Sequence, residues 1–205
     1  MKFRKCKFKD WAFLLALRND QTTRSNSFDQ GEINIDMHKE WLKNSLQSPS
    51  RKIIILEVDG QPAGIIREDV SLKFRDGIIL SWAVSPDFRG KGLGTKILSH
   101  IAKNRMETLY AEIKDNNIPS IKMAEKNNFK IYGLVDNCAD SKIYKKRGFS
   151  EIINEIENVR KANNVKWMDL LRLAFEENPA SAKKLFSKIN ENDNKISSLL
   201  SELVE

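Results

Sequence analysis

The sequence of 205 residues has few of the residue types that form crosslinks and metal sites. It has two cysteines, Cys6 and Cys138, and two histidines, His38 and His100, and the members of each pair lie far apart. A disulfide framework needs more cysteines, and a zinc site needs ligands at close spacing. We therefore expect neither, no metal cofactor, and a protein that works in a reducing cytoplasm.

Long apolar runs are also missing. No segment approaches the roughly 20 apolar residues that a membrane-spanning helix needs. Residues 1–6 are basic, but the apolar core of a secretion signal does not follow them. We therefore expect no contact with a membrane and a cytoplasmic location.

The sequence lacks a concentrated basic stripe, although its net charge is +7 from 35 Lys and Arg and 28 Asp and Glu. A protein that binds nucleic acid gathers its basic residues in a patch or along one face. Here they are spread among acidic residues, so we expect no nucleic-acid partner. A solvated surface explains most of this charge, and the alternative is attraction to phosphorylated small molecules.

Apolar periodicity predicts both helices and strands up to about residue 148. Helices are expected over residues 9–17, 37–46, 95–106 and 119–126, and strands over residues 52–58, 62–68, 78–84, 109–113, 129–135 and 141–146. Asp59-Gly60 is a strong hairpin signal, and Pro119 suits the first turn of a helix. The order of these elements predicts an α+β fold in which helices flank a mixed sheet.

No strand pattern remains after Gly148, where helices are expected over residues 150–162, 165–177, 179–190 and 195–204. Residues 149–205 are therefore predicted to form an all-α appendage. Its three apolar stripes are Val165, Trp167, Met168, Leu170, Leu171, Ala174 and Phe175; Leu185, Phe186 and Ile189; and Ile196, Leu199, Leu200, Leu203 and Val204. Because exposed apolar surface marks interfaces, we expect residues 149–205 to mediate self-association or to bind a protein of the same pathway.

A glycine-rich segment between a strand and a helix is the most informative part of the sequence. Residues 89–95 read Arg-Gly-Lys-Gly-Leu-Gly-Thr. Glycines let the backbone turn tightly and point several N–H groups into one concavity, and the following helix adds the positive end of its dipole. The segment therefore predicts a pyrophosphate site. It matches neither a Rossmann fingerprint, which needs a glycine at position 95, nor a Walker A loop, which needs Gly-Lys-Ser/Thr.

The spacing Arg89-x-x-Gly92-x-Gly94 resembles the acyl-CoA pyrophosphate signature of the GNAT N-acetyltransferases. Asn117-x-x-Ser120, between a strand and a helix, resembles the second half of the acyl-CoA site in that superfamily. The resemblance covers residues 1–147 and is nearest to the branch of bacterial aminosugar and ribosomal-protein N-acetyltransferases. It implies a GNAT mixed, mostly antiparallel sheet and an acetyl-CoA-binding catalytic domain over residues 1–148, whereas the appendage resembles no family that we recognise.

The resemblance implies acetyl-CoA as the co-substrate and no metal. It implies that the pantetheine arm pairs with the backbone of Ala83 and Val84 and lies near Asn117 and Ser120. The pyrophosphate is expected on the N–H groups of Gly90, Lys91, Gly92, Leu93, Gly94 and Thr95, with positive charge from Arg89 and Lys91.

Direct attack of an amine on the thioester, which the resemblance implies, needs a group that takes a proton. Glu112 stands where resembling aminosugar enzymes have a candidate base, although an ion-paired strand glutamate is the alternative. His38 is a second candidate, because histidine titrates near neutral pH, and its alternative is packing beside Trp41. The tyrosine that often protonates the leaving thiolate is replaced by Ala124. Tyr144 becomes the acid only if residues 137–149 are the matching segment.

The acceptor site is expected to use Arg18 and Arg67, because guanidinium groups bind phosphates well, together with His38, Trp41 and Trp82. Ordinary ion pairs and buried tryptophans are the alternatives for these residues. The most plausible acceptor is a primary amine on a nucleotide-linked amino sugar of surface-glycan biosynthesis. The alternatives are a protein N-terminus and a non-catalytic GNAT-shaped adaptor that acts through its helical tail.

Overall fold

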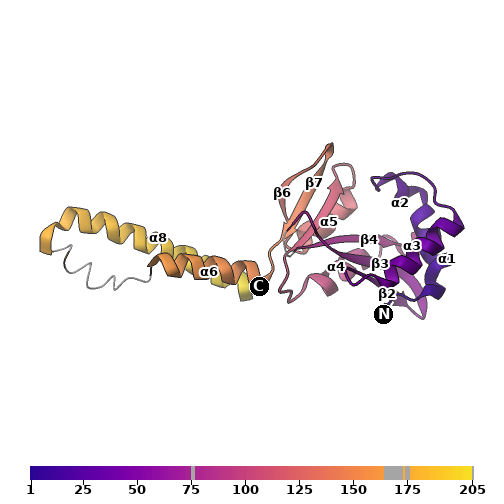
Figure 1. Ribbon diagram of the computed structural model, residues 1–205, viewed down its shortest axis with the longest axis horizontal. Coiled ribbons are helices and arrows are strands. Elements are labelled where there is room, and N and C mark those ends of the chain that lie inside the picture. Colours follow the sequence, from indigo (N-terminus) through magenta and orange to yellow (C-terminus); the bar gives the residue numbers. More distant parts are fainter. Residues whose placement is uncertain (75–76, 164–172, 174–175, 205) are drawn as a thin grey trace. The chain divides into compact units, whose positions relative to one another are not determined.

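Seven strands form one sheet in the computed structural model, which describes residues 1–74, 77–163, 173 and 176–204 (Figure 1). In spatial order they are β1 (Lys2–Lys5), β2 (Arg51–Val58), β3 (Gln61–Val70), β4 (Ile78–Val84), β5 (Leu109–Lys114), β7 (Cys138–Lys146) and β6 (Lys130–Val135). All neighbouring strands are antiparallel except β4 and β5, which are parallel. The predicted α+β fold with a mixed, mostly antiparallel sheet is confirmed.

Helices cover both faces of this sheet. The segment η1 (Phe8–Asp10) and the helices α1 (Trp11–Asn19), α2 (Gln21–Ser25) and α3 (Ile35–Gln47) lie on one side. The segment η2 (Pro86–Phe88) follows β4, and α4 (Leu93–Ala102) and α5 (Ile118–Lys126) cover the other side. The chain divides into two compact units, Met1–Arg147 and Gly148–Glu205.

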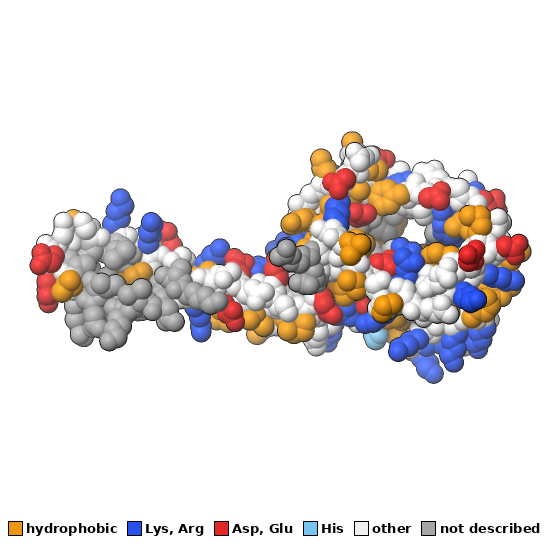
Figure 2. All heavy atoms as spheres, in the orientation of Figure 1, with side chains coloured by type: hydrophobic (Ala, Val, Ile, Leu, Met, Phe, Trp, Pro, Cys, Tyr) orange, Lys and Arg blue, Asp and Glu red, His pale blue; other side chains and the backbone are white. Residues whose placement is uncertain are grey.

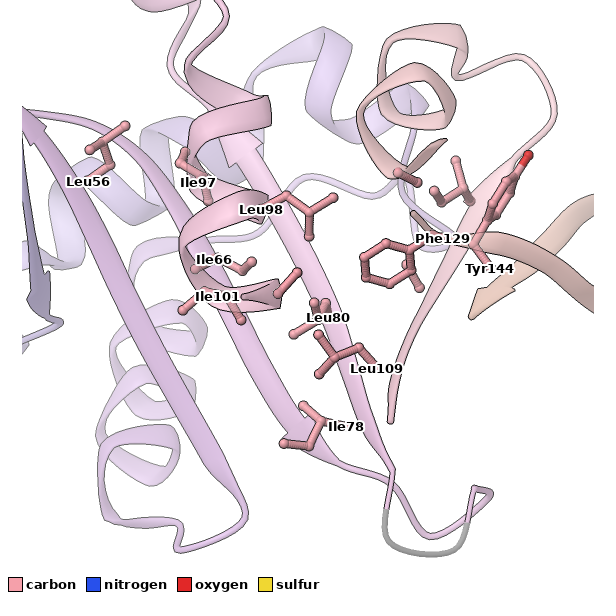
Figure 3. Packing of buried hydrophobic residues seen from close by; sticks show 14 of the residues in the cluster. Leu56, Ile66, Ile78, Leu80, Ile97, Leu98, Ile101, Leu109, Phe129 and Tyr144 are labelled. Carbon is pink, nitrogen blue, oxygen red and sulfur yellow. The ribbon is translucent and has the colours of Figure 1, made fainter. Parts of the chain in front are cut away.

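The larger core lies between α4 and the sheet. Ile97, Leu98 and Ile101 recur at helical spacing, are at most 6% exposed, and point toward strand residues that include Ile66 and Leu80 (Figure 3). Burying each such side chain stabilises the fold by about 1.5–3 kcal/mol. This packing fixes the start of α4, and so the glycine segment before it, against the end of β4.

The second core lies between α1, α3 and the opposite face of the sheet. Leu14 of α1 and Leu42 of α3 pack with Ile53 and Ile55 of β2. Alternation along β2 explains why neighbouring residues reach opposite cores, since Leu56 packs against α4 instead.

Two short elements of the unit Met1–Arg147 were not predicted, and one predicted helix begins and ends earlier than expected. Strand β1 consists mostly of charged residues, and α2 lies inside what the sequence predicts to be a polar loop. The helix predicted over residues 95–106 begins at Leu93, because Gly92 already caps it with φ 71°, and ends at Ala102.

The second unit contains two long helices, α6 (Phe149–Asn163) and α8 (Pro179–Val204), with a small shared core of Ile152, Ile156, Leu199 and Leu203. The prediction of separate helices over 179–190 and 195–204 is wrong, because the polar residues between them include no glycine or proline and the helix continues. Most of the helix predicted over 165–177, with its stripe around Trp167, lies outside the described residues. Among the described helices, none is long and apolar enough to cross a membrane.

Candidate functional site

The parallel strands β4 and β5 separate partway along their length. They pair only at Ile78 with Leu109 and at Ile79 with Tyr110, yet β4 continues to Val84 and β5 to Lys114. Beyond the paired residues, the facing backbone edges are free to receive an extended molecule as an added strand. Ser81, in the middle of β4, is exposed, as expected beside such a slot.

The backbone alternation decides which residues of β4 face the slot. Ser85 donates its N–H to the carbonyl of Ala63 (2.9 Å), and Ala83 lies opposite Ile65 in the same ladder. The polar groups of Ala83 therefore point to β3, and those of Val84 point to the slot. The predicted pairing of pantetheine with Ala83 does not fit this geometry, whereas pairing with Val84 does.

The glycine segment forms a tight loop that leads into α4. Gly90 (φ 74°) and Gly92 (φ 71°) have left-handed conformations, which only glycine adopts without strain. A Cβ at either position would meet nothing within 4 Å, so the requirement is conformational and the space above the loop is open. Gly92 caps α4 without any side-chain hydrogen bond. The first N–H groups of α4, at Leu93, Gly94 and Thr95, are thus available to an anion.

Gly94, unlike Gly90 and Gly92, is needed for close packing between helices. It is buried inside α4, and a Cβ there would lie 2.1 Å from the Sδ of Met123 in α5. The two glycines of the signature therefore have different physical roles: Gly92 shapes the loop, and Gly94 lets α4 and α5 approach each other.

The side chains of the two cations of the loop both have hydrogen-bond partners within the protein. Lys91 is exposed and donates to the carbonyl of Asp87 (3.0 Å). Arg89 donates through Nε to the carbonyl of Val84 (3.0 Å) and through Nη2 to Asp20 (2.5 Å). The expectation that the Arg89 side chain adds charge to the pyrophosphate site is not supported, because this side chain is bound to the start of α2.

Asp20 holds this arrangement as the N-cap of α2. It accepts hydrogen bonds from the backbone and hydroxyl of Thr23 as well as from Arg89. Burial alone would raise the pKa of Asp20, but these hydrogen bonds outweigh burial and hold its pKa below the ordinary value. The carboxylate is therefore ionised throughout the physiological range, and the ion pair persists there.

Asn117 turns the chain from β5 into α5. Its side-chain oxygen accepts the N–H of Ser120 (3.3 Å), which caps α5 close to the end of β5. The competing segment, residues 137–149, forms β7 rather than a strand followed by a helix at its asparagine. The local structure thus favours the match at Asn117 and Ser120.

Ala124 and Tyr144 belong to the same buried cluster. Ala124 is fully buried and Tyr144 is 3% exposed, beside Phe129 in Figure 3. Burial raises the pKa of Tyr144 above its ordinary value. The side chain of Tyr144 comes from β7, so it is not the helix tyrosine of the usual pattern.

Glu112 lies on β5, two residues beyond Tyr110, the last residue of β5 that pairs with β4. Its neighbours Ala111 and Ile113 face the core under α4 and α5, so Glu112 points to the opposite face of the sheet. There Lys73 places its Nζ 3.6 Å from Glu112 and 2.8 Å from Asp136. The carboxylate therefore borders the slot and is held by one exposed lysine that sequence reasoning did not single out.

His38 and Trp41 form part of the packing between α1 and α3. His38 is 3% exposed and donates a hydrogen bond to the carbonyl of Trp11, and its ring lies 5.3 Å from that of Trp41. Burial lowers the pKa of His38, so its imidazole is neutral near pH 7. The buried position of His38 gives no support to a role in the reaction, whereas Trp41, which is only partly buried beside Leu42, stays a predicted acceptor residue.

The predicted acceptor residues are distributed differently. Arg67 lies opposite Ser81 in the ladder, close to the slot, but pairs with Asp69 (2.7 Å). Arg18 donates to the carbonyl of Asp29 (2.8 Å) and thereby fixes the loop after α2. Trp82 packs against the main core, so it does not wall a pocket on the face of Glu112.

Lys114, at the end of β5, is a further residue that the sequence did not reveal. It is 7% exposed, and its Nζ donates to the carbonyl of Ser25 at the end of α2 (3.0 Å). The two residues are 89 positions apart, so no local pattern links them. Among the described residues, no group of histidine, cysteine and carboxylate side chains is arranged to hold a metal ion.

Comparison with known proteins agrees with this geometry. Residues 11–129 match the model of the Acetyltransferase (GNAT) family. A search of curated proteins finds no match.

Solved structures with the same fold include several N-acetyltransferases. A ribosomal-protein-alanine N-acetyltransferase from Brucella melitensis is 22% identical, with a TM-score of 0.60 over 71% of this chain and 99% of that one. An N-acetyltransferase from Staphylococcus aureus Mu50 is 25% identical, with a TM-score of 0.60 over 71% and 96%. A spermidine N-acetyltransferase from Vibrio cholerae, solved with CoA and spermine, is 14% identical, with a TM-score of 0.60 over 70% and 92%.

Proposed function

The chain belongs to the GNAT acetyltransferase family, whose model matches residues 11–129, and we propose from this how its own residues act. It is an acyl-CoA-dependent N-acetyltransferase. Acetyl-CoA, when bound, supplies an acetyl thioester that an amine can attack. The residues of the chain bind this co-substrate, orient the amine and remove its proton.

The binding role is assigned to the loop and the slot. The N–H groups of residues 90–95 hold the pyrophosphate, and the N–H of Val84 pairs with the pantetheine arm. This proposal is supported by the left-handed Gly90 and Gly92, the open space above them and the uncapped start of α4. Asn117 and Ser120 line the far side of the slot, where they shape the start of α5.

Glu112 is our candidate for the group that takes the proton of the amine. This role is supported by the position of Glu112, which lies two residues beyond the last pairing of β5 with β4 and on the face of the sheet away from α4. The carboxylate already holds one ammonium group, that of Lys73, 3.6 Å away. The acceptor amine and Lys73 therefore compete for Glu112.

The acceptor is proposed to be a primary amine on a nucleotide-linked amino sugar, handled in the cytoplasm. Two cationic side chains, Lys73 and Arg67, lie on the face of Glu112, where an acceptor phosphate would compete with their carboxylate partners. Acidic side chains lie among the basic ones on the face drawn in Figure 2. The observation that carries the proposal is therefore this pair of cations beside the slot, not the overall charge.

A screen of acceptors tests this proposal. Purified protein and acetyl-CoA are incubated with nucleotide-linked amino sugars, polyamines or N-terminal peptides, and the released thiol is measured. We expect turnover with a nucleotide-linked amino sugar and none in the Gly92→Glu variant. Turnover confined to peptides would assign the chain to protein N-terminal acetylation. No turnover despite tight binding of acetyl-CoA would favour an adaptor that acts through its helical tail.

A further inference from the structure

Helix α2 is held in place by its ends and not by a core. It has five residues, none of which is buried, and the whole segment 21–34 contains no buried residue. So short a helix is not stable alone, because one or two hydrogen bonds do not repay the entropy of ordering it. The position of α2 must therefore come from the polar contacts that it makes.

The first end of α2 is bound to the strand β4 side of the slot. Arg89 reaches Asp20 (2.5 Å) and the hydroxyl of Thr23 (3.3 Å), while its Nε holds the last carbonyl of β4, at Val84 (3.0 Å). Arg89 is also the first residue of the glycine segment. Its backbone thus belongs to the acetyl-CoA loop, and its side chain belongs to the cap of α2.

The second end of α2 is bound to the strand β5 side of the slot. The nearly buried Lys114, the last residue of β5, donates to the carbonyl of Ser25, the last residue of α2. Val84 and Lys114 end the two strands whose pairing stops at Ile79 and Tyr110. Helix α2, about 7.5 Å long at 1.5 Å per residue, therefore crosses the slot where its two sides have separated.

We propose that Arg89 and Lys114 are positioning residues that hold α2 across the acetyl-CoA slot and couple the cofactor loop to the acceptor side. The inference rests on the proposed function, since it takes residues 90–95 as the cofactor loop. Acetyl-CoA that orders this loop also fixes the backbone of Arg89, and so the cap of α2. By thermodynamic reciprocity, an acceptor that binds against α2 then tightens the hold on acetyl-CoA.

Hydrogen–deuterium exchange of the segment 20–27, followed by mass spectrometry, tests the proposal on the full chain. Arg89→Gln and Lys114→Met should each speed exchange in this segment roughly tenfold, as expected from the loss of a hydrogen bond to a charged group. Calorimetry should find the acetyl-CoA affinity of Arg89→Gln within about threefold of the wild type, because the backbone donors of the loop remain. Acetyl-CoA should slow exchange of the segment in the wild type and not in Arg89→Gln.

Two controls separate this coupling from general destabilisation. Arg105→Gln breaks another partly buried ion pair, with Glu68 (3.0 Å), and should lower the melting temperature without selective exchange at residues 20–27. Arg89→Lys keeps the charge but not the two-ended contact, so it should fall between the wild type and Arg89→Gln. With an acceptor in hand, the acceptor should tighten acetyl-CoA binding by the wild type, and Arg89→Gln should lose this gain and show a raised KM for the acceptor.

The opposite outcomes are distinct. Loss of acetyl-CoA affinity by more than tenfold in Arg89→Gln, with unchanged exchange of α2, would assign the guanidinium to the pyrophosphate and overturn the proposal. Exchange of α2 that ignores acetyl-CoA in the wild type would overturn the coupling. Failure of the wild type to bind acetyl-CoA would instead contradict the proposed function, and the exchange of the two variants without ligand would still decide whether Arg89 and Lys114 hold α2.

Discussion

Gly92 combines a left-handed backbone with open space above it, and these two properties lead to different predictions for two substitutions. In Gly92→Glu, the side chain and its charge fill the place proposed for the pyrophosphate, so we expect acetyl-CoA binding to be lost in calorimetry. Gly92→Ala is the matched control. It carries the same backbone strain, of the order of 1 kcal/mol, but leaves most of the space free and should weaken binding far less. Undiminished affinity in Gly92→Glu would remove the loop as the binding site.

Glu112 is predicted to matter through the proton that it accepts. Glu112→Gln should lower turnover at neutral pH and recover part of it at higher pH, where more of the acceptor amine is already deprotonated. A pH–rate profile of the variant measures this. If the profile of the variant has the shape and height of the wild-type profile, Glu112 is not the base, and its only role is the ion pair with Lys73.

His38 is predicted to affect stability and not chemistry. Because burial lowers its folded-state pKa, the unfolded chain binds the proton first as pH falls below about 6.5. The wild type should therefore lose stability between pH 7 and pH 5 by this route, while His38→Gln, which cannot titrate, should lose less. Urea midpoints at the two pH values measure the difference, and turnover of His38→Gln at pH 7 should stay close to that of the wild type. A stably folded His38→Gln variant that has lost most of its turnover would mean that His38 takes part in the reaction.

Sequence analysis located the loop but not the directions of its side chains. Gly90 and Gly92 could be read from the sequence, because a left-handed backbone has a strong residue preference. Arg89 and His38 could not, because their partners are set by the fold: Asp20 is 69 residues from Arg89. A cation inside a phosphate motif suggests a phosphate ligand even where, as here, it binds a helix cap.

At the scale of elements, periodicity predicted six of the seven strands of the sheet. It missed β1 and α2, since neither has an apolar pattern: both are held by partners, β1 by pairing with β2 and α2 by Arg89 and Lys114. The separation of β4 and β5 was also beyond sequence reasoning alone, because apolar strands look alike whether or not their ends are paired. The resemblance to a family supplied only the expectation that pantetheine pairs with the backbone of Ala83 and Val84.

The packing of α5 lets us predict what happens when Ala124 is replaced by the tyrosine that is usual in the family. Ala124 is fully buried against Phe129 and Tyr144, so Ala124→Tyr would overpack this cluster and should destabilise the protein by about 1–3 kcal/mol. Thermal unfolding should show a lower melting temperature, and turnover should not rise. A variant with the wild-type melting temperature and faster turnover would mean that α5 can turn the new side chain into the slot.

At the scale of the molecule, the second unit leaves apolar side chains in water. Phe186 is 48% exposed, Leu200 44% and Val204 87%, although α6 and α8 share a small core. We predict that residues 149–205 mediate self-association or contact with a pathway partner. Protein truncated after Gly148 should still bind acetyl-CoA, because the loop and the slot lie in residues 1–147.

Light scattering on the full-length and truncated proteins decides the self-association part of this prediction. A change in oligomeric state on truncation supports it, and two monomers of the expected masses would contradict it. Acetyl-CoA binding by the truncated protein serves as the control for folding.

Residues 21–34 include no buried residue, so this segment can be substituted more freely than the rest of the unit. Substitutions there remove no core residue. On the proposal that α2 borders the acceptor, acceptor preference can therefore be redesigned there at little cost to the stability of the fold. The constraints are local: Asp20 and Thr23 must still meet Arg89, a backbone carbonyl must still meet Lys114, and Asn34 must still cap α3. A library restricted to residues 21–34, with Thr23 and Asn34 kept, would therefore explore new acceptors on an unchanged acetyl-CoA site.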